Sequence, residues 1–354
     1  MKILVIGGTG AMGVPLVDLL SQNNENRIFV TSRSNRDSCG NIFYIKGNAK
    51  DECFFKSLLD EFYDVIIDFL VYNTEQLKKR LPVFLEHTKQ YFFFSSARCY
   101  ADSQGPITEE SDRLVDVCMD TEYLATDEYG LAKGREENIL KSCGKKNWTI
   151  IRPYITYNQY RLQLGVYEKE NWLKRALEGR TIVFPRDIAE SKTSLTYGPD
   201  VAQAIIGLIG NEKAYGEAFH ITTEESHTWE EILEHYLYII EKNTGKRPKV
   251  KYLSDSKELQ KIWNPWQIKY DRLYDRIFDN SKFKLVRGVY EYKPTFAGLE
   301  LCLSEFIKNP EWREINIRFE AWCDRQTGEI TPIWSFSGIR AKARYIKWRF
   351  FCKS

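Results

Sequence analysis

The amino-acid sequence predicts an α/β protein with a Rossmann-type, doubly wound parallel sheet, a smaller C-terminal domain and an added C-terminal extension. Residues 2–6 (KILVI) form the apolar run typical of a strand buried on both faces of a sheet. The glycine-rich stretch 7–13 (GGTGAMG) follows without a spacer, and apolar residues at helical spacing come next. Further apolar runs then alternate with helical patterns, which is the rhythm of a parallel sheet covered by helices.

The later strands are expected where short apolar runs end near polar or glycine residues. These runs are 27–31, 43–48, 64–71, 90–94 and 148–151. Strand–helix–strand units of this length are right-handed, and the carboxyl ends of their strands form the binding edge of the sheet. We expect residues 1–157 to form this domain, with 194–211 returning to it, 158–308 to form a second, substrate-binding part, and 309–354 to form the extension.

The glycine-rich stretch predicts a cradle for the pyrophosphate of a dinucleotide. Gly7 allows a tight turn, Gly10 has no Cβ to block the phosphates, and Gly13 lets the helix pack close to the strand. The free N–H groups and the dipole of the helix N-terminus face the anion. The cofactor-binding candidates in this stretch are Gly7, Thr9, Gly10, Ala11, Met12 and Gly13.

Other candidates for cofactor binding follow the ends of later strands. Arg33 comes after the second strand, where an acid would suit NAD and an arginine suits the 2′-phosphate of NADP, so NADP is favoured over NAD. Arg33 could instead stack on the adenine of either cofactor. Asn48 could hold the adenine edge. Candidates at other strand ends are Phe69, Leu70 and Pro153.

Composition excludes several other classes of protein. The 354 residues are 43% hydrophobic and 28% charged, and the net charge of +2 does not indicate a nucleic-acid partner. The chain starts with its first strand and holds no apolar run of membrane-spanning length, so we expect neither a signal peptide nor a membrane span. The eight cysteines and four histidines lack metal-ligand spacing, which favours reduced thiols, no metal site and a cytoplasmic location.

The catalytic candidates are a serine, a tyrosine and a lysine. Ser96 follows the strand 90–94, and Tyr129 and Lys133 lie four residues apart, on one face of a helix. A nearby ammonium stabilises a phenolate, so such a tyrosine can exchange a proton with a sugar hydroxyl or ketone while hydride moves to or from a nicotinamide. The serine hydroxyl would hold the same oxygen.

These motifs resemble those of the extended short-chain dehydrogenase/reductases, in the NAD-dependent epimerase/dehydratase family. The glycine spacing, the segment 94–100 (FSSARCY) and the Tyr129–Lys133 pair carry the resemblance. It is supported by 152–154 (RPY), 196–202 (TYGPDVA) and 279–282 (DNSK), so that it spans about residues 1 to 308. The resemblance implies a nucleotide-sugar substrate, a smaller substrate domain and, in many members, a homodimer. It also makes Ser96 the catalytic serine.

Departures from the family pattern narrow the expected reaction. The dehydratases of this family carry an Asp-Glu pair where this chain has Ala97 and Arg98, which makes dehydration less favoured. Some epimerases use a cysteine at the position of Ala97, and we interpret the nearby Cys99 as a packing residue. We therefore expect an epimerase, with an NADPH-dependent 4-ketosugar reductase as the alternative. A second alternative is a non-catalytic dinucleotide sensor or nucleic-acid-binding relative.

Substrate contacts are expected from the second part of the chain. Arg161 is the first candidate to clamp the diphosphate of the substrate, with Arg272 and Arg276 as alternatives that would share one face of a helix. These arginines and the aromatic residues near Arg161 could equally pack between domains.

The extension is expected to hold a β-hairpin and a basic aromatic helix. Residues 315–322 alternate apolar with polar, and a turn at 324–328 precedes 329–334. Residues 338–354 carry six basic residues and no acidic one, interleaved with large apolar residues. Such a helix could lie on an anionic membrane or bind a polyanion, or it could dock on a dimer partner or on acidic residues of the same chain.

Overall fold

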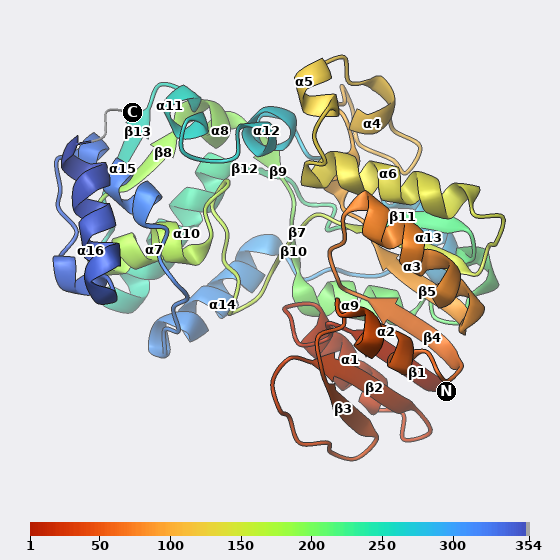
Figure 1. Ribbon diagram of the computed structural model, residues 1–354. Coiled ribbons are helices and arrows are strands. Elements are labelled where there is room, and N and C mark those ends of the chain that lie inside the picture. The colour runs from red at the N-terminus through yellow and green to blue at the C-terminus, as the bar shows by residue number, and fades with distance from the viewer. Residues whose placement is uncertain (352–354) are drawn as a thin grey trace. The chain divides into compact units, whose positions relative to one another are not determined.

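A seven-stranded parallel sheet in the order β11-β6-β5-β4-β1-β2-β3 lies at the centre of the first of two units (Figure 1). The computed structural model describes residues 1–351. Unit 1 comprises residues 1–156, 194–224 and 277–293, and unit 2 comprises 157–193, 225–276 and 294 onwards. The strands of the sheet are β1 (Lys2–Ile6), β2 (Arg27–Ser32), β3 (Ile42–Lys46), β4 (Tyr63–Asp68), β5 (Thr88–Phe94), β6 (Trp148–Pro153) and β11 (Glu217–Ile221).

Helices cover both faces of this sheet. Because side chains alternate across a strand, Ile3 and Val5 of β1 join one apolar cluster and Leu4 and Ile6 join the other. The first cluster is completed by α1 (Gly13–Ser21), α9 (Gly198–Ile206) and α13 (Ser281–Arg287). The second is completed by α2 (Glu52–Leu58), α3 (Thr74–Glu86) and α6 (Tyr129–Ser142).

The topology confirms the predicted α/β class and the doubly wound parallel sheet. β1 pairs with both β2 and β4, so the strand order reverses beside β1, and this is where such sheets bind ligands. The edge strand β11 was not predicted from the sequence. Its five residues (EAFHI) include a histidine, which interrupts the apolar pattern expected of a buried strand. His220 is nevertheless buried, because each of its ring nitrogens has a hydrogen-bond partner.

Unit 2 packs helices around two small sheets. A parallel pair joins β8 (Ile182–Pro185) to β13 (Val250–Leu253), and an antiparallel pair joins β9 (Lys192–Thr193) to β12 (His227–Thr228). Helix α10 (Trp229–Thr244) begins with a capping box formed by Thr228 and Glu231 and ends at Gly245 in the left-handed conformation. Beside it lie α7 (Lys169–Leu177), α8 (Arg186–Glu190) and α14 (Thr295–Lys308).

Shorter elements connect these parts. They are η1 (Ala97–Cys99), α4 (Leu114–Val117), α5 (Thr121–Leu124), β7 (Ile155–Tyr157), β10 (Leu195–Tyr197), η2 (Glu212–Ala214), α11 (Lys257–Gln260), α12 (Pro265–Gln267) and η3 (Ile268–Arg272).

The predicted hairpin in the extension is wrong. Residues Ile317–Thr327 form a helix, α15, that begins at the N-cap Asn316 and ends at Gly328 in the left-handed conformation. Its buried face includes Glu320 and Asp324, whose carboxylates bind Arg175 of α7. Because two of the residues on the buried face are acidic, the apolar residues alone do not show the helical spacing of that face.

The predicted basic aromatic helix is present as α16 (Gly338–Ile346), after η4 (Ile333–Ser335). It continues as the π-helical turn η5 (Lys347–Phe351). The last part of the predicted segment, residues 352–354, lies outside the described residues. Within residues 1–351, no helix is both long and apolar enough to cross a lipid bilayer.

Candidate functional site

The glycine-rich turn between β1 and α1 has the form that an anion cradle requires. Gly7 has φ of 72°, and its N–H donates to Oγ1 of Thr31 at 2.9 Å, which fixes the turn against β2. A Cβ on Gly13 would lie 2.6 Å from the backbone of Gly8, whereas a Cβ on Gly10 would meet no atom within 4 Å. Helix α1 has no side-chain cap at Met12. The turn therefore leaves open space at Gly10 beside a helix N-terminus, and it fits a pyrophosphate.

The other cofactor candidates lie at the ends of neighbouring strands. Phe69 and Leu70 follow β4, and the Leu70 side chain comes within 3.3 Å of a Cβ built on Gly7. Arg33 and Asn48 are exposed beyond β2 and β3, although Oδ1 of Asn48 already accepts the N–H of Lys50 at 3.1 Å. Pro153 is buried at the end of β6. Whether these residues contact a cofactor remains a prediction.

Tyr129 and Lys133 lie on the first turns of α6, with two cations near the Tyr129 ring. Nζ of Lys133 is 5.9 Å from the ring centroid, and the guanidinium of Arg98 is 5.2 Å from it. An ion pair of 2.6 Å with Glu128, the N-cap residue of α6, holds Arg98 in place. Arg98 thus lies beside the Tyr129 ring. From the sequence, Arg98 was of interest only because dehydratases of the resembled family carry a carboxylate at its position.

Ser96 lies on the adjacent turn, between β5 and η1. Its Oγ accepts the N–H of Arg98 at 3.2 Å and caps η1. The carbonyl of Arg98 lies only 2.8 Å from a Cβ built on Gly130, so glycine at this position lets the serine turn approach the start of α6. Ser95 faces elsewhere, because its hydroxyl donates to Oε1 of Glu137 at 2.6 Å.

Two buried carboxyl groups near Lys133 were missed by the sequence analysis. Nζ of Lys133 donates to Oε2 of Glu136 at 2.8 Å, and Asp68, at the end of β4, accepts the hydroxyl of Tyr91 at 3.0 Å. Burial raises the pKa of Glu136 and that of Asp68 to about 6 each, although the Lys133 ammonium acts to lower both. The position of Asp68 at a strand end was the available signal.

A second buried network lies behind the serine turn. Arg152 of β6 donates to both oxygens of Glu137, at 2.8 and 2.6 Å, and to the hydroxyl of Tyr100 at 2.7 Å. Burial acts to raise the pKa of Glu137, but Arg152 and its other donors outweigh this and hold the pKa below its ordinary value. The Tyr100 hydroxyl lies 3.3 Å from Nδ1 of His220, and Nε2 of His220 lies 2.7 Å from the carbonyl of Asp279.

The direction of this hydrogen-bond chain follows from its ends. A carbonyl only accepts, so Nε2 of His220 carries the proton, and Nδ1 accepts from Tyr100, which in turn accepts from Arg152. Burial lowers the pKa of His220 to about 4, so the imidazole stays neutral at ordinary pH.

Unit 2 holds the three arginines predicted to bind a diphosphate. Arg161 is partly exposed and pairs with Glu168 at 3.4 Å. Arg272 and Arg276 are buried around one carboxylate, Asp271, with Nε of Arg276 3.2 Å from Oδ1. Helix η3 ends at Arg272, so the expectation that Arg272 and Arg276 share one helix face is wrong. Their binding of a diphosphate remains a prediction.

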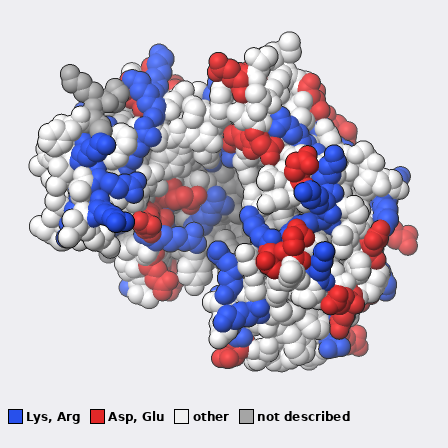
Figure 2. Space-filling model, viewed as in Figure 1, with Lys and Arg blue, Asp and Glu red and all other residues white. Residues whose placement is uncertain are grey.

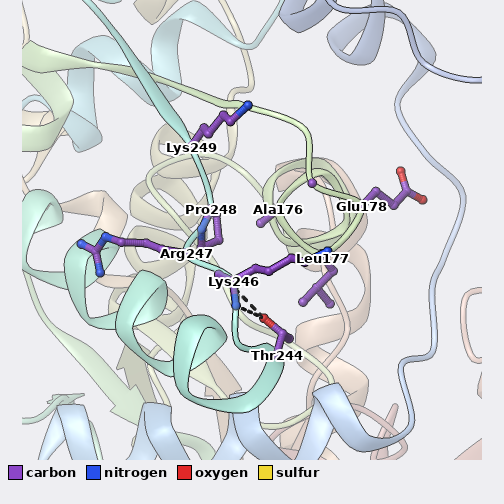
Figure 3. Close-up of a pocket in the computed structure, with 9 residues that line it drawn as sticks. Ala176, Leu177, Glu178, Thr244, Lys246, Arg247, Pro248 and Lys249 are labelled. Atoms are coloured by element: carbon purple, nitrogen blue, oxygen red, sulfur yellow. Dashed lines mark hydrogen bonds between the residues drawn. The ribbon is translucent and has the colours of Figure 1, made fainter.

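A cavity of about 510 Å³ in unit 2 does not contain any predicted site residue (Figure 3). It lies between the end of α7 and the segment after α10, where Lys246 and Lys249 extend from the chain. Among the described residues, no three His, Cys, Asp or Glu side chains gather as they would around a metal ion.

Comparison with curated proteins gives one relative to report. The chain is 30% identical over 247 residues to "Chloroplast stem-loop binding protein of 41 kDa b, chloroplastic" of Arabidopsis thaliana. The match covers 65% of this chain and 60% of the relative, so the chain matches about three fifths of that protein's length. No protein-family model matches the sequence.

Comparison with solved structures shows the fold. The dTDP-glucose 4,6-dehydratase of Bacillus anthracis, in complex with NAD, matches with a TM-score of 0.66 and 20% identity over 88% of this chain and 98% of that one. The UDP-glucuronic acid 4-epimerase of Bacillus cereus, also with NAD, matches with a TM-score of 0.65 and 17% identity over 88% and 97%. The epimerase Mth375 of Methanothermobacter thermautotrophicus matches with a TM-score of 0.67 and 18% identity over 87% and 92%.

Proposed function

From the fold that this chain shares with the extended short-chain dehydrogenase/reductases, we propose that it is an NAD(P)-dependent enzyme acting on a nucleotide-linked sugar. The observation that carries the proposal is the placement of Tyr129 and Lys133 at the start of α6, with the Arg98 guanidinium over the same phenol ring. The glycine turn at residues 7–13, which fits a pyrophosphate, supports it.

The proposed reaction moves a proton and a hydride between substrate and site. The Tyr129 phenolate takes the proton of a sugar hydroxyl while the carbon of that hydroxyl loses hydride, and the reverse step returns both to the ketone. A bound nicotinamide dinucleotide supplies the hydride acceptor and donor. Lys133 and Arg98 place positive charge beside the phenolate, and the Ser96 hydroxyl donates to the reacting oxygen.

The positions next to Ser96 favour epimerisation or reduction over dehydration. Ala97 and Arg98 have no carboxyl group, so neither supplies the acid and base that expel water, and Arg98 instead pairs with Glu128 and lies over the Tyr129 ring. An epimerase oxidises, reorients the ketone and reduces again, and a 4-ketosugar reductase uses the last of these steps alone. We propose an epimerase first and the reductase as the alternative.

The identity of the bound dinucleotide, and whether it stays bound during purification, distinguishes an epimerase from a reductase. Arg33 favours NADP, but the Bacillus anthracis dehydratase and the Bacillus cereus 4-epimerase are both in complex with NAD, which does not support an NADP preference. Mass spectrometry of the dinucleotide released when the purified protein is denatured tests the cofactor. Stoichiometric NAD⁺ supports an epimerase that recycles its cofactor. An empty protein that binds NADPH supports a reductase, and a protein that binds neither dinucleotide contradicts the proposal.

A second candidate function is nucleic-acid binding. The observation that favours it is the 30% identical relative, whose name describes stem-loop binding. Against it stand the net charge of +2 and the retained Ser96, Tyr129 and Lys133. Titration of the protein with a stem-loop RNA at several salt concentrations, beside a turnover assay on the same preparation, separates the two functions.

A further inference from the structure

Helix α16 and its continuation η5 present two different faces, and only one of them is packed. Tyr345 is 1% exposed and joins an apolar cluster with Ile317 and Ala321 of α15. Its hydroxyl donates to Oδ2 of Asp324 at 2.5 Å. Ala341 and Trp348 pack against the same cluster. These contacts fix which side of the helix faces the rest of unit 2.

The opposite side carries an exposed apolar stripe, formed by Ile339, Ala343, Ile346 and Phe350. Ile339, Ala343 and Ile346 are spaced by four and three residues, which places them in one row along α16, and Phe350 follows in the turn η5. Ile339 is 85% exposed and Phe350 is 57% exposed. Trp334, in the preceding η4, is also 81% exposed. Large apolar side chains in such a row mark an interaction site.

Basic residues border the stripe on both sides. At 100° per residue, Arg340 and Lys347 lie beyond one edge of the apolar stripe and Lys342 lies beyond the other. Figure 2 shows Lys and Arg side chains gathered where Figure 1 places α16. From Gly338 to Phe351 the sequence has no Asp or Glu. The exposed side of the helix is therefore apolar along its middle and positive along its borders.

We propose that residues 334–351 form an interfacial anchor that binds a lipid bilayer with anionic headgroups. Apolar side chains in the middle of a helix face can enter the acyl region, while flanking Lys and Arg contact the headgroups and Trp lies at the interface. A polyanion such as RNA matches the basic borders, and its unpaired bases could stack on Phe350, but it gains nothing from the aliphatic Ile339 and Ile346 of the stripe. A second copy of the helix would bring the two positive borders together, which like-charge repulsion opposes.

The stripe supplies the apolar part of binding, and the borders supply the electrostatic part. Both parts are needed, because a few buried side chains or a few cations alone give weak membrane binding. The proposal does not depend on the reaction assigned to the site in unit 1, since all its residues belong to unit 2.

Co-sedimentation of the full chain with vesicles tests the proposal. One set contains phosphatidylcholine alone, and the other contains phosphatidylcholine with phosphatidylglycerol. We expect binding to the anionic vesicles, weakening as salt is added, and little binding to the neutral ones. Ile339→Ser/Phe350→Ser should lower the partition coefficient by about tenfold or more, and Arg340→Glu/Lys347→Glu should lower it similarly.

Matched variants and a second ligand distinguish the outcomes. Leu285→Ser/Val289→Ser and Lys78→Glu/Lys79→Glu change exposed residues of unit 1 and should bind as the original chain does. Unchanged near-ultraviolet circular dichroism shows that the variants fold. The proposal is overturned if the original chain does not sediment with anionic vesicles, or if the Ile339→Ser/Phe350→Ser variant binds them normally. Loss of RNA binding by the charge variant, without vesicle binding by the original chain, would also overturn it.

Discussion

At the scale of single residues, the tyrosine at the start of α6 is the group on which the proposed chemistry depends. Its ring is flanked by Lys133 and Arg98, and its hydroxyl is the atom that exchanges a proton in the proposed reaction. Replacing the hydroxyl by hydrogen therefore removes the acid and base without removing the ring.

We expect Tyr129→Phe to reduce turnover by about 10² to 10⁴-fold while the dinucleotide content of the purified protein stays the same. Tyr238→Phe is the matched control, because Tyr238 is half exposed on α10 and takes no part in the proposed site. Initial rates and the mass of the released dinucleotide measure both effects. Normal turnover in Tyr129→Phe would rule out the proposed acid/base role.

His220 gives a residue-scale prediction about pH. Its pKa is about 4 in the folded chain and near 6.5 when unfolded, because burial opposes its charged form and Arg152 adds to that effect. Above pH 6.5 the imidazole is neutral in both states, and its full contribution to stability is present. As pH falls towards 4, His220 binds a proton in the unfolded chain but stays largely neutral in the folded chain. The free energy of unfolding therefore decreases by about 3 kcal/mol.

His220→Gln should lose less stability than the original chain between pH 6.5 and 4, since glutamine does not titrate. The comparison must be a difference between the two proteins, because Asp68 and Glu136, with pKa values raised to about 6, change stability in the opposite direction over this range. Urea unfolding at several pH values measures it. Parallel pH profiles would contradict the assigned pKa of His220.

The sequence predicted the local part of the candidate site but not its buried support. Short sequence motifs can be recognised without a structure, and they predicted the roles of Gly7, Gly13, Tyr129 and Lys133. Glu137 was not predicted, because its partners Ser95, Arg113 and Arg152 come from distant parts of the chain. Nothing in the residues next to Glu137 indicates that it is buried.

At the scale of elements, the approach of α1 to β1 depends on a missing side chain. A Cβ on Gly13 would lie 2.6 Å from the backbone of Gly8, closer than Cβ atoms come to other heavy atoms. The helix would have to move away from the strand to accept alanine, and the N–H groups that face the cradle would move with it.

We expect Gly13→Ala to fold but to weaken dinucleotide binding by about tenfold or more, because the turn would lose its geometry around the phosphates. Gly105→Ala is the control, since a Cβ there meets open space. Isothermal titration with NAD⁺ and NADP⁺ gives the two affinities. Equal affinities in the two variants would show that the close approach is not required for binding.

The wrong prediction of a hairpin where the chain forms α15 also concerns a single element. Residues 315–322 alternate between apolar and polar types, which is the sequence pattern typical of a strand. The side chains that α15 buries include Ile317, Glu320, Ala321 and Asp324, which follow helical spacing once carboxylates count as buried. Acidic residues are buried only when paired, and the partner Arg175 lies more than a hundred residues earlier.

At the scale of the whole molecule, buried charge joins the extension to the rest of unit 2. Arg175 of α7 donates to Glu320 and Asp324 at 2.6 and 2.8 Å and to Glu329 at 3.0 Å. Arg180 donates to the hydroxyl oxygen of Thr331, and the Thr331 hydroxyl is hydrogen-bonded to Glu320 and Asp324. The segment predicted as a C-terminal extension is therefore packed within unit 2.

We expect Arg175→Met to lower the free energy of unfolding by about 3–5 kcal/mol, because the buried Glu320 and Asp324 would keep, among the described residues, only Arg180 as a cation and the partly buried Glu329 would lose Arg175. Arg186→Met is the control, since Arg186 and its partner Glu230 are both exposed and such pairs contribute less than about 1 kcal/mol. Urea unfolding compares the variants, and cleavage near α15 by a protease reports local release. Equal losses in the two variants would contradict the role given to Arg175.

The predicted class and sheet were confirmed because they rest on patterns repeated over many residues, from β1 to β6. The seventh strand was missed because Glu217 and His220 interrupt the apolar pattern of its five residues. The homodimer implied by the resemblance stays a prediction, and sedimentation velocity of the full chain measures it. A cytoplasmic location also stays a prediction, and the Arabidopsis relative is described as chloroplastic.

Unit 1 is built from three separate stretches of the chain, so the ribosome cannot finish its synthesis until much of unit 2 has also been made. β6 is synthesised roughly 60 residues before its neighbour β11, which corresponds to about 3–12 s of translation. During that interval the outer edge of β6, with Ile150 and Ile151, has no strand beside it, and much of unit 2 has yet to be made. An unpaired apolar edge is prone to aggregate, so the nascent chain is exposed to aggregation until β11 has been made and paired.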